Sequence, residues 1–292
     1  MARFASGLSV HPEAAVAVGE VVGAVIDALG PGPDLALLFV SGRMVDHLGD
    51  ILRAVDALLC PGEMLAATAV GVLAGTEETE TGDAVVLWAG QTGPVATVRL
   101  EALPGTPPIF VGLPDAIDDQ GTIILLADPT TFPIEEFLSH LAEHRPGMVV
   151  VGGLASLGPG RNRLGHRETV HDSGAVAVVL PPGVAASVVS QGCRPIGQPW
   201  IVTAGDGQML HELGGVPALD RVEQMIADLD PRDRRCASSG LHIGIVVDEG
   251  LTDFGPGDFL IRGVMGADRG RRSVAVGAPI DVGRTVQFQV RD

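Results

Sequence analysis

The chain has 292 residues, 46% of them apolar, and a formal net charge of −17. This length suffices for one large or two ordinary domains with a well-buried core. The negative charge argues against nucleic acid and against anionic membrane surfaces as partners, because both bind basic surfaces.

The first third of the chain alternates between strand and helix patterns. Apolar residues recur every three to four positions in two segments, which predicts amphipathic helices over 12–29 and 45–58. Apolar runs bounded by turn residues predict strands over 2–10, 35–40, 64–73, 84–89 and 95–100. We expect the last two strands to pair as a hairpin around 91–93, and the acidic run 77–80 to form a solvated turn.

The same order of parts follows the Pro-rich connector 104–114. The patterns predict a strand over 122–127, a helix over 133–144, a strand over 148–151, a polar loop over 159–172, and strands over 175–180 and 185–190. The segment 73–86 also parallels 154–177. Two similar half-units, roughly 34–103 and 121–195, are the simplest account, although any αβ chain with meanders could match by chance.

Both explanations predict the same fold class for the N-terminal part of the chain. We expect an α/β (α+β) fold with mixed and antiparallel sheets and outer helices, in a layered α/β/β/α-like sandwich.

The last eighty residues are mostly strand-like. A helix is predicted over 217–229, then a charged turn over 232–235 and strands over 241–247, 259–265, 273–276 and 285–290. The final strand ends without a cap or a following helix, so we expect an open sheet that a longer chain or a partner would complete.

One stretch, 190–204, has no helical period. Gly192, Pro195 and Gly197 free or fix its backbone, and Pro195 and Pro199 restrict the residues before them to extended conformations. We therefore expect a stiff loop that could form a pocket wall. Two roles are open for the Arg194 side chain: an exposed surface charge, or a planar guanidinium that pairs with a carboxylate.

Catalytic motifs are weak. The sequence contains no GxSxG, so Ser156 has no nucleophile elbow, and Cys193 has a neighbouring cation in Arg194 but no histidine nearby in sequence. Gly152 and Gly153 follow a strand and could let backbone N–H groups approach an anion, although a tight turn is the simpler explanation. All nineteen basic residues are Arg, which excludes lysine chemistry such as Schiff bases.

Metal and cofactor motifs are also missing. The only group with ligand-type side chains spans 166–172, and its arginine neighbours make it a poor cation site. The three cysteines, Cys60, Cys193 and Cys236, include no CxxC and fit free thiols in the cytoplasm. We predict no metal, no cofactor and a cytoplasmic location.

Three segments together resemble one known family. The segments 191–197, 202–204 and 214–219 look like the signature that closes the N-terminal FIST domain, and 151–156 resembles its other glycine-marked segment. The resemblance implies an N-terminal FIST domain over 1–212 and the beginning of a C-terminal FIST domain over 213–292, which stops early. It also implies a ligand-sensing domain that binds small molecules such as amino acids and works with signalling modules such as histidine kinases.

We therefore expect a cytoplasmic sensor of a small molecule, an amino acid or organic acid, acting in signal transduction. The predicted ligand-binding residues are Gly152, Gly153, Ser156, Gly192, Cys193, Arg194 and Gly197. In this hypothesis Arg194 anchors a ligand carboxylate, and the N–H groups of Gly153 and Gly192 hold its oxygens. Two alternatives stay open: a hydrolase- or transferase-type enzyme that uses Cys193 or Ser156, and a protein-interaction scaffold.

Overall fold

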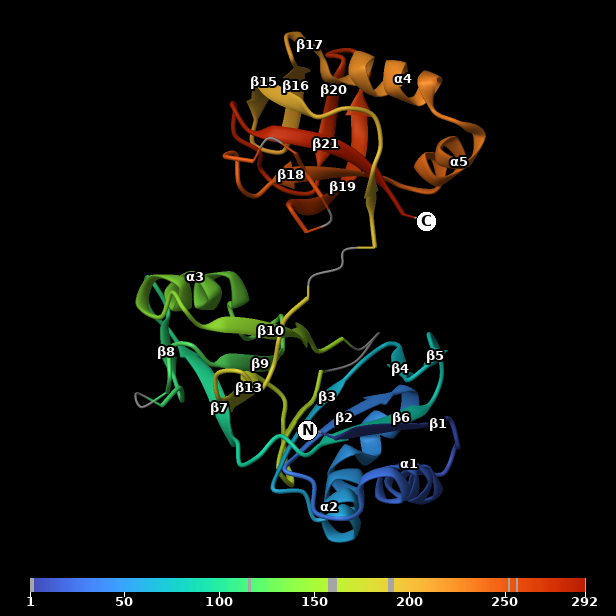
Figure 1. The fold of residues 1–292 in the computed structure, drawn as a ribbon, viewed down its shortest axis with the longest axis vertical. Helices are drawn as coiled ribbons and strands as arrows, with labels where there is room; N and C mark the ends of the chain where they lie inside the picture. Colours follow the sequence, from blue (N-terminus) through green and yellow to red (C-terminus); the bar gives the residue numbers. More distant parts are fainter. Residues whose placement is uncertain are drawn as a thin grey trace. The chain divides into compact units, whose positions relative to one another are not determined.

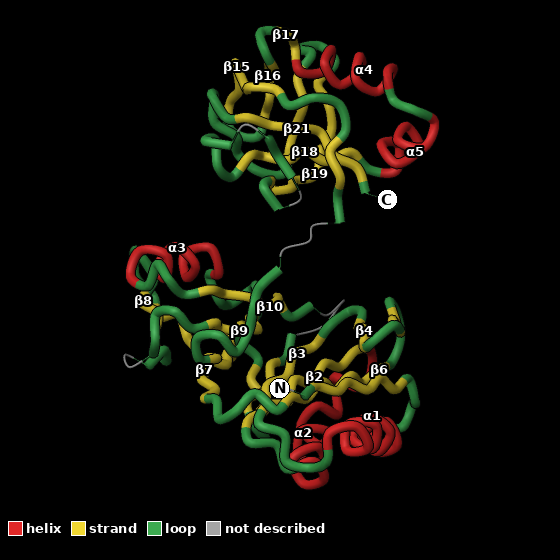
Figure 2. The backbone as a smooth tube through the Cα atoms, in the orientation of Figure 1, coloured by secondary structure: helices red, strands yellow, loops and turns green. Residues whose placement is uncertain are grey.

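The computed structural model describes residues 3–114, 117–156, 162–188, 192–251, 253–255 and 257–291. The chain divides into two compact units, Met1–Ser187 and Val188–Asp292, each of which is described by itself (Figure 1). Figure 2 shows that helices and strands are mixed in both units.

The first unit contains two mixed sheets. The first sheet has the order β1 (Phe4–Ser9), β6 (Ala84–Gly90), β2 (Leu35–Ser41), β3 (Glu63–Thr68), β11 (Leu164–His166), β12 (Thr169–His171). The second has the order β10 (Val149–Leu154), β9 (Thr122–Ala127), β13 (Ala175–Leu180), β7 (Ala96–Leu103), β8 (Ile109–Val111). A separate hairpin is formed by β4 (Val72–Ala74) and β5 (Glu77–Thr79).

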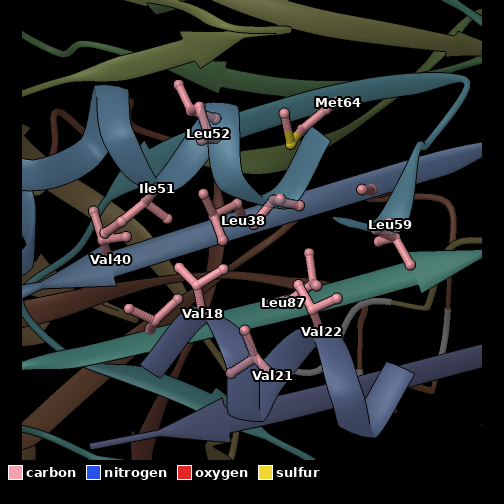
Figure 3. Close-up of a cluster of buried hydrophobic side chains, with 14 of the residues drawn as sticks. Val18, Val21, Val22, Leu38, Val40, Ile51, Leu52, Leu59, Met64 and Leu87 are labelled. Carbon is pink, nitrogen blue, oxygen red and sulfur yellow. The ribbon is translucent and has the colours of Figure 1, made fainter. Parts of the chain in front are cut away.

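Helices cover the outer faces of these sheets. α1 (Ala14–Leu29) and α2 (Leu48–Leu59), the latter preceded by the 3₁₀ helix η1 (Gly42–His47), pack on the first sheet, as the side chains of Val22, Leu52 and Leu87 show (Figure 3). α3 (Ile134–His144) packs on the second sheet through Phe137 and Leu141. A further apolar cluster lies between the sheets. The predicted α/β/β/α layering is therefore confirmed.

The two sheets are built on the same plan. β2 is parallel to β3 and antiparallel to β6, which pairs in turn with β1. β9 is likewise parallel to β10 and antiparallel to β13, which pairs with β7. Two similar half-units are therefore present, although the predicted repeat boundaries stay a prediction. The predicted hairpin of 84–89 with 95–100 is wrong, because β1 and β2 already occupy both edges of β6.

The second unit is a sheet that closes on itself. β21 (Thr285–Val290) pairs on one side with β14 (Arg194–Pro195) and β15 (Trp200–Asp206), and on the other with β18 (Leu241–Val246). The ring continues through β16 (Met209–Leu213), β20 (Ser273–Val276) and β19 (Phe259–Asp268), and β17 (Val216–Pro217) pairs with β16. The open C-terminal sheet expected from the sequence is therefore wrong, because β18 joins both β19 and β21.

Two helices flank this closed sheet. α4 (Ala218–Asp228) buries Leu219, Val222 and Met225 in the apolar core of the unit. α5 (Pro231–Ser239) replaces the predicted charged turn at 232–235. Its N-cap carboxylate, Asp230, accepts a hydrogen bond from the backbone N–H of Asp233, and Pro occupies its first turn. Both features favour a helix, although none of its residues is fully buried.

Other predicted boundaries also differ. The predicted strand 64–73 ends as β3 at Thr68, whose carbonyl accepts the N–H of Ser156, and resumes as β4. The predicted turn 77–80 contains β5, and the predicted loop 159–172 contains the β11–β12 hairpin, with its turn at Arg167 in the left-handed region (φ 53°). The described part of 185–190 forms no strand.

Candidate functional site

The predicted site residues fall into two groups, one in each unit. Gly152, Gly153 and Ser156 belong to the first unit. Gly192, Cys193, Arg194 and Gly197 belong to the second. The motif residue Gln191 lies outside the described residues.

In the first unit, Gly152 and Gly153 lie in β10 and line an apolar groove of about 230 Å³ beside α3. Gly152 adopts φ 145°, and a Cβ atom added there would lie 1.9 Å from the carbonyl oxygen of Leu125. Gly153 has no such restriction, because nothing lies within 4 Å of its added Cβ. Close backbone approach to β9 therefore requires glycine at 152 and not at 153.

Ser156 lies just beyond the end of β10. Its N–H donates to the carbonyl of Thr68 (3.0 Å), and its hydroxyl accepts from the N–H of Val70 (3.3 Å). Ser156 thereby joins the ends of β10 and β3, where parallel strands of both half-units finish. A groove of about 470 Å³ opens nearby, lined by Phe39, Ala69, Gly71, Val72, Leu73, Glu78, Thr79 and Glu80.

A buried carboxylate that the sequence analysis missed lies at the end of β9. Asp128 is 2% exposed and accepts hydrogen bonds from Thr130, Thr131 and Asn162 (2.6–3.2 Å). Burial acts to raise the pKa of Asp128, but these hydrogen bonds outweigh it and hold the pKa below its ordinary value. The Asp-Pro-Thr-Thr sequence that follows β9 is a turn signal that could have identified this residue.

In the second unit, the motif forms the side of the closed sheet that faces α4 and α5. Arg194 and Pro195 pair with the end of β21, and Ile196 is buried with its N–H bonded to the carbonyl of Phe288 (2.9 Å). Gly197 adopts φ 62°, and its carbonyl accepts from Nε2 of Gln287 (2.9 Å). The loop is therefore held by backbone and side-chain bonds, as its Gly and Pro content predicts.

Arg194 pairs with a carboxylate of its own chain. Its Nη1 donates to Oδ2 of Asp233 (3.1 Å), and its Nη2 donates to Oδ1. The hydrogen bond and charge of Arg194 lower the pKa of the Asp233 carboxyl. Because Asp233 lies in the first turn of α5, this bidentate pair ties β14 to that helix.

The groove beside this loop has an arginine with different partners. It measures about 540 Å³ and is lined by Gly197, Gln198, Trp200, Arg221, Gln224, Met225, Asp228 and Leu229. The Arg221 guanidinium lies 3.9 Å from the centre of the Trp200 ring. Its Nε donates to the carbonyl of Leu213 (3.2 Å) and its Nη2 to that of Gly214 (3.4 Å). Among the described residues no carboxylate pairs with Arg221.

The groove residues of α4 share one face of the helix. Arg221, Gln224, Met225 and Asp228 are spaced at i, i+3, i+4 and i+7, which places their side chains in one row. Arg272 holds α4 in place by donating from Nε to Asp220 (2.6 Å) and from Nη1 to Glu223 (3.2 Å). The helical spacing of Arg221, Gln224 and Asp228 is the signal in the sequence that could have identified the polar side of this row.

The enzyme alternatives require a general base beside Ser156 or Cys193. Within the described residues, neither Ser156 nor Cys193 is hydrogen bonded to a histidine. Also within that part of the chain, no three His, Cys, Asp or Glu side chains are grouped to hold a metal ion. No helix of the described ranges is long and apolar enough to cross a membrane.

The fold and the grooves together define an α+β protein with doubled half-units and a closed-sheet unit that bears a polar and aromatic groove. The chain belongs to the FIST family, because the model of the FIST N domain matches residues 34–216.

Two mycobacterial relatives resemble nearly the whole chain. Uncharacterized protein MT0656 of Mycobacterium tuberculosis is 40% identical over 294 residues, which cover 99% of this chain and 77% of that protein. Uncharacterized protein Mb0898c of Mycobacterium bovis is also 40% identical over 294 residues, covering 99% of this chain and 76% of that protein.

Proposed function

We propose that this chain is the ligand-binding input domain of a signalling system, and that it binds a small carboxylate such as an amino acid or organic acid. One observation carries the proposal. The Arg221 guanidinium is stacked on Trp200 in a groove of about 540 Å³, and among the described residues only backbone carbonyls accept its hydrogen bonds.

The chemistry of the groove suits such a ligand. A guanidinium prefers a carboxylate to a carbonyl, because a charge-assisted pair is stronger than a neutral hydrogen bond. Trp200 offers an apolar face. The Asp228 carboxylate offers an acceptor for an ammonium group, and Gln224 offers an amide. A pocket that combines aromatic walls with a few polar groups is typical of small-molecule sites.

The anchor role moves from Arg194 to Arg221 in this proposal. Both terminal nitrogens of Arg194, Nη1 and Nη2, donate to Asp233, so a ligand carboxylate that paired with this fork would have to displace the carboxylate of Asp233. Arg194 instead positions the loop that carries Gly197 into the groove wall. The contribution of Gly152, Gly153 and Ser156 to ligand binding stays a prediction.

The biological setting is also part of the proposal. No disulfide joins Cys60, Cys193 or Cys236 within the described residues, which supports a reducing, cytoplasmic location. A separate signalling protein, such as a histidine kinase, would read out the bound state, as the family resemblance implies. The relatives carry names that assign no ligand or partner.

Calorimetry of the full chain against a panel of amino acids and organic acids tests the proposal. We expect Arg221→Ala to weaken binding of the best ligand about 10- to 100-fold, the equivalent of one charged hydrogen-bonded pair. Arg194→Ala should reduce stability and leave the affinity of the folded protein within a few-fold. Arg53→Ala, at an exposed side chain of α2 in the first unit, is the control. An affinity that depends on Arg194 and not on Arg221 would overturn the assignment.

A further inference from the structure

The edge of the second sheet in the first unit is open along β10. Within the described residues, β10 pairs only with β9. The equivalent edge in the other half-unit is covered, because β3 pairs with the antiparallel strand β11. The short hairpin that follows β3 does not extend along β10, since Val72 packs against Ala84 and Val86 of β6.

The pairing pattern shows which backbone groups are free to bond. Val149 and Ala155 donate their N–H groups to Gly121 and Ala127, on the β9 side. Because successive residues of a strand point their backbone groups to opposite sides, Val150, Gly152 and Leu154 direct theirs outward. The outward N–H of Ser156 already bonds to Thr68, so the open edge ends there.

This edge also has an apolar groove beside it. Ile134 and Leu138 of α3 and residues 150–154 of β10 line the space of about 230 Å³, to which Gly152 contributes no side chain. Figure 1 shows α3 and β10 as neighbouring elements of the first unit. Leu138 is 42% exposed and Leu154 48% exposed. The strand has no charged residue or proline, the features that usually protect an edge from pairing.

We propose that this edge binds an extended peptide segment of a partner protein, which adds as an antiparallel strand to β10. Apolar side chains at alternate positions of the segment enter the groove under α3, while its backbone bonds to Val150, Gly152 and Leu154. Strand addition beside a helix uses main-chain bonds for affinity and the groove for specificity.

Charge selects the kind of partner. Exposed Glu135 precedes Leu138 by three residues on α3, so it flanks the same side of the helix. The whole chain carries a net charge of −17, which disfavours a second copy of itself at this edge. The segment is therefore expected to carry Arg or Lys beside its alternating apolar residues. This inference does not depend on the carboxylate site of the second unit.

The test uses the full chain and labelled ten-residue peptides in fluorescence anisotropy. The test peptide alternates Val with Thr and ends in two Arg. One control peptide has the same sequence but ends in two Glu, and a second control carries N-methyl groups on alternate backbone nitrogens. We expect the test peptide to bind at least tenfold more tightly than either control peptide. Leu138→Glu should weaken its binding at least tenfold, whereas Leu58→Glu, at a leucine of α2 that is also exposed (54%), should not.

Hydrogen exchange supplies an independent readout. In the free protein the amides of Val150, Gly152 and Leu154 should exchange faster than those of Val149, Val151 and Gly153, and the bound peptide should protect the first three. Equal binding of all peptides, unchanged binding by Leu138→Glu, or protection elsewhere overturns the proposal. So does a concentration-dependent dimer, seen by sedimentation, that Leu138→Glu abolishes, because a second copy would then be the occupant.

Discussion

At the scale of single residues, Arg194 and Arg221 of the second unit differ in whether a carboxylate pairs with the guanidinium. Arg194 already faces Asp233 in a fork-to-fork pair, so its charge is used inside the fold. Arg221 is fixed by an aromatic ring and two carbonyls, which orient a guanidinium without neutralising it. A positioned cation without a carboxylate is a better binding group than a neutralised one.

The two adjacent glycines of β10 give a sharp residue-level prediction. Gly152→Ala should destabilise the first unit by about 3 kcal/mol or more, because the new Cβ would overlap a backbone oxygen that cannot move independently. Gly153→Ala is the matched control, and should cost less than about 1 kcal/mol since its Cβ enters open space. Urea unfolding measures both, and equal costs would contradict the close approach of β10 and β9.

Asp128 predicts how the stability of the first unit depends on pH. Its pKa is lower in the folded state than the ordinary value of about 4. The stability that it contributes is therefore present above that ordinary value and is lost as the pH falls through the lower, folded pKa. Asp128→Asn should cost about 2 kcal/mol at pH 7, because hydrogen bonds to a buried charge become bonds to a neutral amide.

Unfolding by urea at pH 7 and at pH 3 measures this effect. The difference in unfolding free energy between the wild type and Asp128→Asn should shrink at the lower pH, where the wild-type carboxyl begins to take up a proton. Asp50→Asn, at an exposed carboxyl of α2, should change stability by less than about 0.5 kcal/mol at either pH. A difference that stayed constant with pH would mean that the pKa of Asp128 is the same in the folded and the unfolded protein, and so is not lowered by folding.

At the scale of elements, apolar periodicity predicted the parts that bury a face. α1, α2, α3 and α4 all lie where three- to four-residue spacing placed them, as do β2, β9 and β13. Two of the elements that the sequence analysis missed, the β11–β12 hairpin and α5, are short and largely polar. The β11–β12 hairpin is stabilised by pairing with β3, and α5 by its cap and by Arg194, so neither shows an apolar period of its own.

The candidate site was predictable in part for the same reason. The backbone constraints of Gly and Pro in 192–199 correctly indicated a held loop, and Gly197 does line a groove. The partner of Arg194 could not be read from the sequence, because Asp233 is 39 residues away and meets it only through the closure of the sheet. Trp200 and Arg221 are likewise joined by tertiary packing alone.

At the scale of the whole molecule, the compact units and the family match divide the chain at different places. Along the sequence, the first unit ends at Ser187 and the second begins at Val188. The FIST N domain match ends at residue 216, and the predicted domain boundary lies at 212. Residues 188–212 supply β14, β15 and most of β16. Val202 and Leu210 from this segment are fully buried in the same apolar core as Phe288 of β21. A boundary at 212 would divide that core.

Fragments of the chain distinguish the two divisions. We expect 1–187 and 188–292 each to fold alone, because each retains its own apolar clusters and hydrogen-bonded sheets. A fragment 213–292 should fail to fold, since its loss of β14 and β15 leaves β21 with only β18 as a neighbour. Circular dichroism and urea unfolding of the three fragments, beside the intact chain, measure this. Cooperative unfolding of 213–292, or disorder of 188–292, would show that the second unit does not begin at the loop preceding β14.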